Sequence, residues 1–476
     1  MRLEDVRESV KDFAHEFRYQ KGGIIGLILL IILVSAAVLA PQITSPDVAK
    51  RWSKEFWVEN PPNVPPTWIN YFSSKKLAPH QVYSINDLEI VDGGDGEKIL
   101  RIVYESNYDV PPKDIVLQGF KVSSHDVKNK PRMTVVLKRP DGLEVKLIED
   151  RMISSNTVIQ IATNTEVKNN VFKWSKEVSD IELKPVEEIK LQALMDTMKI
   201  LFGKIDENIF KQPTPLHGKY VLEIRIKTVD DGDVLDLSGF SVIFSGRTFG
   251  LMGTDSKGRD IWAGLVWGTR VSLAVGIAVA VLSVLIGIVY GVASAYFGGW
   301  KDETMQRFNE FMFSLPVLPI LILLGAYFKG HVDLFQIVLL LVLFGWVGVA
   351  KVARSMALQI KEQTFVEAAR ALGAGSGRIV FKHIMPQIMP YAFSQMALSV
   401  PYAVMTEAAL SFLGLGDPTA VTWGQMLYDA QNAGATINGY WWWVVPPGLA
   451  IALVGLAFVL LGVALDRILN PRMRTL

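Results

Sequence analysis

The sequence contains no cysteine and only six histidines. The absence of cysteine excludes disulfides, thiolate metal sites and cysteine nucleophiles, so any domain outside the cell must be held together by its apolar core alone. His80, His125 and His217 stand far apart in the chain and form no paired ligand pattern. The sequence therefore predicts surface histidines and no metal site.

Two motifs that carry catalysis are also missing. No Gly-x-x-x-x-Gly-Lys-Ser/Thr loop occurs, so nothing in the chain is built to cradle nucleotide phosphates. No Gly-x-Ser-x-Gly elbow occurs either, because Ser376 follows Ala374 and Gly375 in a segment that favours helix rather than strand, turn and helix. The sequence predicts no catalytic residues, and ATP hydrolysis linked to this chain must come from another chain.

Net charge is nearly absent, with 48 basic against 47 acidic residues, but the charges and the apolar residues are segregated. Apolar runs occur near the start and through the last half, and residues 41–246 between them have the composition of a soluble domain. The apolar segments predicted to span a membrane are residues 22–40, 271–297, 311–328, 334–350, 388–413 and 448–465. Tyr440 and three following tryptophans precede the last segment, as an interfacial aromatic belt would. A cleaved signal peptide is the alternative for the first segment, but that run exceeds a usual h-region and follows several acidic residues.

The distribution of Lys and Arg predicts the orientation of these six spans. If the N-terminus is cytoplasmic, sixteen basic residues fall in inner connections and five in outer ones, outside the large domain. The five outer residues are Arg247, Lys257, Arg259, Arg270 and Lys329. This ratio predicts that both termini lie inside and that residues 41–246 lie outside the cytoplasm.

Residues 41–246 show the alternating pattern of half-buried strands. The pattern is clearest at residues 99–104, 133–137 and 220–226, with turn residues at 92–94 and 141–142. It predicts short antiparallel strands in a sandwich. Residues 186–202 have apolar side chains at helical spacing and predict one helix. This β-rich domain is interpreted as a binding or docking module.

The connection between the fourth and fifth spans predicts a helix, a break and a second helix. Thr364 and Glu367 have the spacing of a capping box, and Gly373 is placed to end the helix in a left-handed turn. Ser376 is placed to cap the second helix, and Pro386 lies where that helix nears the membrane. The first helix has one face of apolar and small residues, formed by Phe365, Ala368, Ala369 and Leu372.

These residues resemble the EAA loop of ABC importer permeases: Glu-Ala-Ala at 367–369, Gly373 after three intervening residues, and Pro386 thirteen residues later. The resemblance implies that the helix seats in a groove of an ATPase subunit and transmits its closure to the spans. A plain capped amphipathic helix would use the same residues. The residues to which the resemblance assigns coupling to the ATPase are Glu367, Ala368, Ala369, Leu372, Gly373 and Pro386.

Further segments resemble one of the two permeases of dipeptide and oligopeptide importers. They are residues 253–260 (GTDSKGRD) with 268–273, 296–300 (YFGGW), 407–416 (EAALSFLGLG) with 422–424, and 470–472. Asp255 and Asp260 do not have the regular spacing of a calcium loop, so a turn fixed by glycine and aspartate is expected there. Glu407 is a carboxylate within the fifth span, which predicts that it faces the translocation pathway or the partner permease rather than lipid.

The resemblance covers about residues 251–474 and implies an all-α membrane permease bundle of six transmembrane helices, of type I importer architecture. The predicted domains are residues 1–40, with the first helix, an inserted β-rich extracytoplasmic domain at 41–246, and the permease core at 247–476. The implied partners are a homologous second permease, two subunits carrying ATP and magnesium, and an external binding protein, in contact with membrane lipid and without nucleic acid. The inserted domain departs from the family, which usually has a short connection there.

The implied function is import of dipeptides or oligopeptides across the cell membrane, by a chain that is not an enzyme and has no cofactor of its own. Oligosaccharides are the alternative substrate for the same architecture. A membrane-anchored receptor or sensor would have one or two spans and a cytoplasmic output domain, and the sequence provides neither. A secondary transporter would show internal repeats with interrupted helices, and no clear repeat is present.

Overall fold

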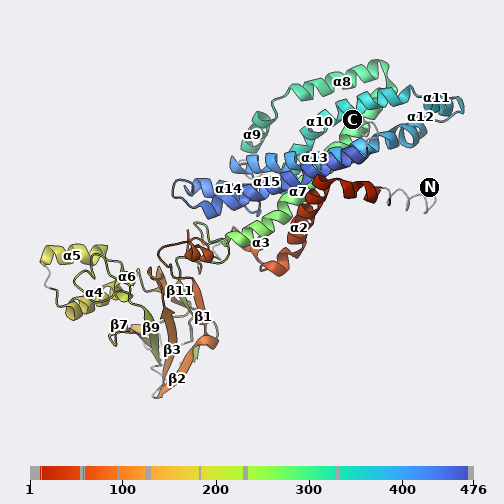
Figure 1. Ribbon diagram of the computed structural model, residues 1–476. Coiled ribbons are helices and arrows are strands. Elements are labelled where there is room, and N and C mark those ends of the chain that lie inside the picture. The colour runs from red at the N-terminus through yellow and green to blue at the C-terminus, as the bar shows by residue number, and fades with distance from the viewer. Residues whose placement is uncertain are drawn as a thin grey trace. The chain divides into compact units, whose positions relative to one another are not determined.

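The computed structural model describes residues 11, 13–53, 57, 59–94, 96–123, 130–181, 184–228, 234–327 and 333–469. The motif at 470–472, His125 and Lys329 lie outside these residues, as do Arg2, Arg7 and the two final arginines of the charge count. The chain divides into two compact units, a helical unit of Met1–Glu55 with Ile261–Leu476 and an inserted unit of Phe56–Asp260 (Figure 1). The predicted boundaries of 41 and 246 therefore differ from this division, because helix α2 continues to Ile43 and residues 247–260 pack within the inserted unit.

The helical unit contains the apolar segments of the sequence. Its elements are α2 (Lys21–Ile43), α3 (Val48–Arg51), α7 (Ile261–Phe297), α8 (Gly299–Ser314), α9 (Val317–Tyr327), α10 (Leu334–Lys361), α11 (Thr364–Ala371), α12 (Ser376–Ile379), η4 (Val380–Ile384), α13 (Met385–Phe412), α14 (Trp423–Asn432) and α15 (Trp441–Leu469).

Four of these helices are long and apolar enough to cross a membrane: α2, α7, α10 and α15. Helices α8 and α9 are long and apolar enough only when they are taken together, as a pair bent by 76°. The predicted span at 311–328 is therefore not one straight helix. Leu315 has extended backbone (ψ 131°) before Pro316, and a residue that precedes proline is biased away from the helical region. Helix α13 contains the predicted fifth span, but it is not among the described helices that are apolar enough to cross a membrane by this criterion.

Helix α7 is central to the packing of the helical unit. It contacts α2, α10 and α13, while α15 packs against α2 and α13. Glycine allows the closest approaches: a Cβ on Gly291 of α7 would lie 2.4 Å from Ala350 O of α10, and one on Gly26 of α2 would lie 2.7 Å from Ala457 O of α15. Small residues at such crossings are typical of helices that associate in membranes.

The inserted unit is built on antiparallel sheets. A five-stranded sheet has the order β2-β3-β9-β6-β7, a four-stranded sheet has the order β1-β11-β4-β8, and β5 pairs with β10. Side chains of both larger sheets share one core, in which Leu100 and Tyr104 of β3 meet Ile115 of β4 and Phe244 of β11. The strands are β1 (Gln81–Ser84), β2 (Glu89–Gly94), β3 (Glu97–Ser106), β4 (Asp114–Gln118), β5 (Lys121–Ser123), β6 (Arg132–Lys138), β7 (Glu144–Met152), β8 (Ile159–Gln160), β9 (Gly218–Lys227), β10 (Val234–Asp236) and β11 (Ser241–Ser245).

The alternating segments became strands as predicted, whereas the predicted helix was wrong in extent. Residues 99–104, 133–137 and 220–226 lie in β3, β6 and β9. Residues 186–202 form two helices, α5 (Pro185–Leu194) and α6 (Thr197–Leu201), because Asp196 accepts the Lys199 N–H and begins the second one. A further helix, α4 (Thr165–Ser179), was not predicted.

The two ends of the inserted unit run side by side. The Phe249 N–H donates to Pro65 O (2.9 Å), and the Thr67 N–H donates to Gly250 O (3.0 Å). The Asn63 N–H donates to Asp255 O at 2.8 Å. Because these bonds lie before β1 and after β11, the β-rich part is inserted into a connection that is already closed on itself. We call residues 59–67 and 249–260 the neck.

Candidate functional site

The predicted coupling segment forms helix α11, but its first turn is not capped as expected. Thr364 is the first helical residue, and the N-cap is Gln363, whose backbone is extended (φ −77°, ψ 144°) and whose side chain makes no capping hydrogen bond. Gln363 O accepts the N–H groups of Val366 (2.9 Å) and Glu367 (3.3 Å). The predicted capping box of Thr364 and Glu367 is therefore wrong, since the box needs its hydroxyl on the extended residue before the helix.

The end of α11 follows the prediction. Gly373 has φ +79°, the left-handed region that favours glycine, and the Ala374 N–H donates to Ala369 O at 3.0 Å. The next helix, α12, has Gly375 as its N-cap and no side-chain cap, so the predicted cap at Ser376 is wrong by one residue. The break between the two helices is thus made by backbone geometry at glycine.

Helix α11 has one anchored side and one open side. Val366 is fully buried in an apolar cluster with Ala295 of α7, Ala357 of α10 and Ile379 of α12. The side chain of Leu372 is 87% exposed. Among the other residues of the predicted face, Phe365 and Ala368 are exposed and Ala369 is half-buried. An exposed apolar surface on a short helix whose opposite side is anchored in a core is typical of a protein contact site.

Glu367 belongs to the open side as well. Its carboxylate is exposed and makes no hydrogen bond or ion pair within the part of the chain that the structure describes. The capping role that would explain this glutamate locally is therefore absent. The carboxylate is available to a partner.

Beyond α12 the chain stays helical as far as Phe412. The π-helical turn η4 joins α12 directly to α13, and Pro386 lies in the first turn of α13, where a missing N–H does no harm. Short π-helical turns inside longer helices occur frequently at functional sites. Figure 1 shows α11 and α12 at one end of the helical unit and α14 at the opposite end.

A salt bridge that was not predicted supports the same end of the helical unit. Arg354 of α10 donates to both carboxylate oxygens of Asp302 in α8, with Nε–Oδ1 at 2.8 Å and Nη2–Oδ2 at 2.6 Å. Ser294 of α7 also donates to Asp302, and Lys361 Nζ donates to Ala295 O (3.2 Å). The signal in the sequence was a pair of opposite charges beside apolar segments, one of them two residues after the YFGGW motif.

Glu407 is enclosed by its own chain. Its side chain is 1% exposed, and Oε1 accepts a 2.8 Å hydrogen bond from Ser411 Oγ on the same face of α13. Helix α14 closes over this position, because a Cβ on Gly424 would lie 2.6 Å from Ala408 Cα. Glu407 on α13 and the EAA segment on α11 are therefore separate sites.

The GTDSKGRD segment forms the turn expected from its residues. Asp255 Oδ1 accepts the N–H groups of Lys257 and Arg259, both at 2.8 Å, and the Arg259 side chain donates to the same carboxylate. Gly258 has φ +76°, and a Cβ there would lie 2.7 Å from Trp57 O. No group of acidic or histidine side chains in the described residues has the arrangement of a metal site.

Comparison with protein families gives two matches. Residues 283–475 match the family described as the binding-protein-dependent transport system inner membrane component. Residues 10–66 match the N-terminal transmembrane domain of oligopeptide transport permease C. The two matches flank residues 67–282, which contain the β-rich part of the inserted unit.

Several curated relatives match a little under half of this chain. The oligopeptide transport system permease protein OppC of Bacillus subtilis (strain 168) is 38% identical over 224 residues, which cover 47% of this chain and 72% of the relative. The dipeptide transport system permease protein DppC of the same strain is 38% identical over 223 residues, 47% and 68% of the two chains. OppC of Haemophilus influenzae (strain ATCC 51907 / DSM 11121 / KW20 / Rd) is 36% identical over 223 residues, 47% and 70%.

Proposed function

Because this chain belongs to the family of binding-protein-dependent transport inner membrane components, as a permease subunit of a peptide ABC importer, we propose that residues 364–373 are the surface on which an ATP-hydrolysing subunit docks. One observation carries the proposal: α11 is anchored by buried Val366 and leaves Leu372, Phe365 and an unpartnered Glu367 on its open side. Burial of such a surface is the main favourable term in protein association. The relatives named above are oligopeptide and dipeptide permeases, which supports peptide as the substrate.

The anchored side supplies a route from the docked subunit to the spans. Val366 packs in one cluster with residues of α7, α10, α12 and α13, so a displacement of α11 displaces groups on three long helices. Packed cores move between discrete arrangements rather than deforming continuously. The Asp302–Arg354 salt bridge keeps α8 with α10 during this movement.

A matched pair of substitutions tests the docking surface. Leu372→Asp places a charge in the proposed apolar contact, and Ile437→Asp makes the same change at a residue that is 92% exposed in the connection between α14 and α15. We expect Leu372→Asp to weaken retention of the ATP-hydrolysing subunit at least about tenfold, or about 1.4 kcal/mol. Ile437→Asp should retain it as the parent does. Equal retention in all three proteins would contradict the proposal.

Two further substitutions separate assembly from coupling. Gly373→Pro is incompatible with φ +79°, because proline fixes φ near about −65°. It should leave ATP hydrolysis without uptake. Glu367→Ala removes the unpartnered carboxylate and should weaken assembly. If both variants assemble and transport as the parent does, residues 364–373 do not have this role.

The remaining parts of the proposal concern the assembly. A second permease completes the translocation pathway, two subunits bind ATP and magnesium and hydrolyse the ATP, and an external binding protein delivers the peptide. This chain is not itself an enzyme. It crosses the cell membrane six times, with α13 and the bent α8–α9 pair as spans, both termini in the cytoplasm and residues 41–246 outside. The excess of Lys and Arg in the inner connections supports this orientation.

Glu407 is proposed to face the pathway or the second permease in the assembled transporter. Its burial between α13 and α14 keeps the carboxylate from lipid, as expected for an ionisable group at that depth. Because the chain has no cysteine, Glu407→Cys provides a single labelling site. Reaction with a lipid-soluble reagent alone, and with no aqueous reagent or crosslinker during turnover, would count against this assignment.

A further inference from the structure

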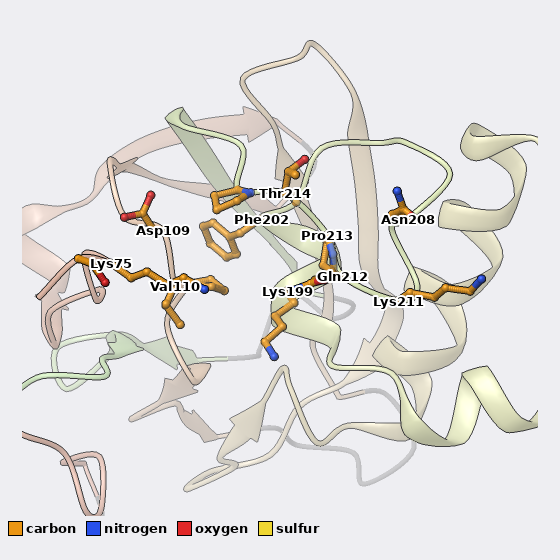
Figure 2. A pocket seen from close by; sticks show the side chains of 14 residues that line it. Lys75, Asp109, Val110, Lys199, Phe202, Asn208, Lys211, Gln212, Pro213 and Thr214 are labelled. Atoms are coloured by element: carbon orange, nitrogen blue, oxygen red, sulfur yellow. The ribbon is translucent and has the colours of Figure 1, made fainter.

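The inserted unit contains a cavity of about 950 Å³ that no part of the proposed function uses. It lies at the end of the five-stranded sheet where β3 finishes and β9 begins, since Ser106 pairs with Gly218 there. Its apolar lining includes Val110, Phe202 and Pro213 (Figure 2). The volume falls in the range of about 300–1,000 Å³ typical of ligand sites.

The floor of this cavity is fixed before any ligand arrives. Phe202 is 3% exposed and packs against Tyr220, with ring centroids 4.5 Å apart. The buried guanidinium of Arg139 donates to the carbonyl oxygens of Leu201 and Gly203, both at 2.7 Å. These bonds hold the end of α6 in place, so binding here would not have to order the wall.

The rim of the cavity carries an excess of positive charge. Lys75, Lys199 and Lys211 come from three separate segments, and Figure 2 shows Lys75 and Lys211 on opposite sides with Lys199 between them. Asp109 is the acidic side chain of the lining, and it already accepts the Lys76 N–H at 2.8 Å. The ammonium groups of Lys75 and Lys211 form no ion pair within the described residues, and that of Lys199 lies 3.7 Å from a carboxylate oxygen of Asp196, in a pair exposed to solvent.

We propose that this cavity binds an extended acidic peptide segment. The three ammonium groups do not converge on one point, so a compact anion would meet them one at a time. A chain that carries several carboxylates reaches all three, and its remaining side chains cover the valine, phenylalanine and proline lining. The segment is either a free peptide or an exposed stretch of a protein that approaches the inserted unit.

Binding of a fluorescent peptide to the purified full-length chain tests the site directly, without ATP or any partner subunit. The probe alternates glutamate with alanine, and a matched probe has glutamine in place of glutamate. The variant carries Lys75→Gln, Lys199→Gln and Lys211→Gln. A control with Lys98→Gln, Lys190→Gln and Lys227→Gln removes the same charge from exposed lysines elsewhere on the unit.

We expect the cavity variant to bind the glutamate probe about tenfold more weakly than the parent, while the control binds as the parent does. A Gln212→Trp variant, which fills the cavity and keeps every lysine, should also lose binding. The inference would be overturned if the control lost binding equally. It would also be overturned if the parent bound the glutamate probe no more tightly than the glutamine probe, a single-stranded oligonucleotide or inorganic phosphate. Because this assay does not involve residues 364–373, its result is independent of the docking proposal.

The second arm separates the two sources of the acidic segment. The external binding protein is added to the parent and to the cavity variant, with the glutamate probe already bound. Displacement of the probe from the parent identifies a segment of that protein as the occupant. Without displacement, the free peptide is the occupant, and both results require the probe to bind in the first place.

Discussion

The two units of this chain place their apolar side chains in opposite ways. In α2 of the helical unit, Ile28, Ile31 and Ile32 are each more than half exposed, and only 17% of the apolar window of that helix is buried. In the inserted unit, Leu100 and Leu222 are fully buried under two sheets. The inserted unit completes its core by itself, whereas the helical unit leaves apolar surface exposed, as helices that cross a membrane do.

Buried carboxylates show the same difference. Glu223 of β9 is 1% exposed and has basic partners from its own sheet, with Arg225 at 2.6 Å and Lys138 at 3.2 Å. Burial alone raises the pKa of Glu223, but the hydrogen bonds from these basic partners hold this pKa below its ordinary value. Glu407 of α13 has Ser411 and no ion pair within the described residues. The buried carboxylate of the inserted unit is therefore neutralised within its own sheet, whereas the buried carboxylate of α13 is held by a hydroxyl group.

The largest effect is expected from a substitution that disrupts the core of the inserted unit. Leu222→Ala should lower its free energy of unfolding by about 2–5 kcal/mol, because the deletion leaves a cavity between packed sheets. Ile90→Ala, on edge strand β2 and 52% exposed, should cost far less. Proteolysis of the inserted unit in the full chain, measured across a urea series, compares the two. Similar losses would mean that the core is not shared between the sheets.

The next prediction uses one substitution in both units. Ile31→Asp, in the middle of α2, should cost about 3 kcal/mol of membrane insertion, because a carboxylate is expensive at the centre of a span. Ile189→Asp, on α5, should change stability by no more than about 0.5 kcal/mol. Ile189 is the more exposed of the two, at 71% against 55%. The measurements are the membrane-integrated fraction for the first variant and urea-dependent proteolysis for the second. A tolerated Ile31→Asp would contradict the assignment of α2 as a span.

The sequence predicted the helices and strands that depend on hydrophobic periodicity and composition. It missed the features that depend on a single side chain. Alternation located β3, β6 and β9, and uncharged apolar runs located α2, α7, α10 and α15. The helix predicted at 186–202 divided at Asp196, because one capping carboxylate outweighed the continuous apolar spacing. The fold of the inserted unit also depends on pairings between strands far apart in the sequence, such as β1 with β11, which periodicity does not encode.

The candidate site was predictable in part for the same reason. Gly373 has the positive φ that its place after the helix indicated. The capping box failed because spacing cannot distinguish Thr364 inside the helix from Thr364 before it. The Asp302–Arg354 salt bridge joins residues of different helices, and their charges alone gave no pairing. The cavity of the inserted unit has no sequence signal, since its lining comes from four separated segments.

A smaller effect is expected at a helix crossing. Gly291→Ala would place a methyl group 2.4 Å from Ala350 O, so α7 and α10 must separate, at a cost of about 1–3 kcal/mol. Gly348→Ala on α10 meets no atom within 4 Å and should be neutral or slightly stabilising, since alanine favours helix. Thermal inactivation of the detergent-purified protein distinguishes the variants. Equal behaviour would show that the close packing of α7 on α10 does not limit stability.

The smallest expected effect is a pH dependence confined to the inserted unit. His80 precedes β1 next to the neck, and its ring lies 5.4 Å from that of Phe249. The prediction of a surface histidine is wrong here, because both ring nitrogens are buried, and neither has a hydrogen-bond partner. Burial lowers the pKa of His80 from its ordinary value of 6.5 to about 4. Between these two values the unfolded chain binds a proton that the folded chain does not, so stability falls as pH falls from about 6.5 to 4 and is unaffected above that window. At pH 5 the loss of stability is about 2 kcal/mol.

His80→Phe should remove this loss, whereas His217→Phe, at an exposed histidine, should keep it. Urea-dependent proteolysis of the three proteins at pH 7 and pH 5 measures the difference, and a parent and His80→Phe variant with the same pH response would show that protonation of this histidine does not oppose folding.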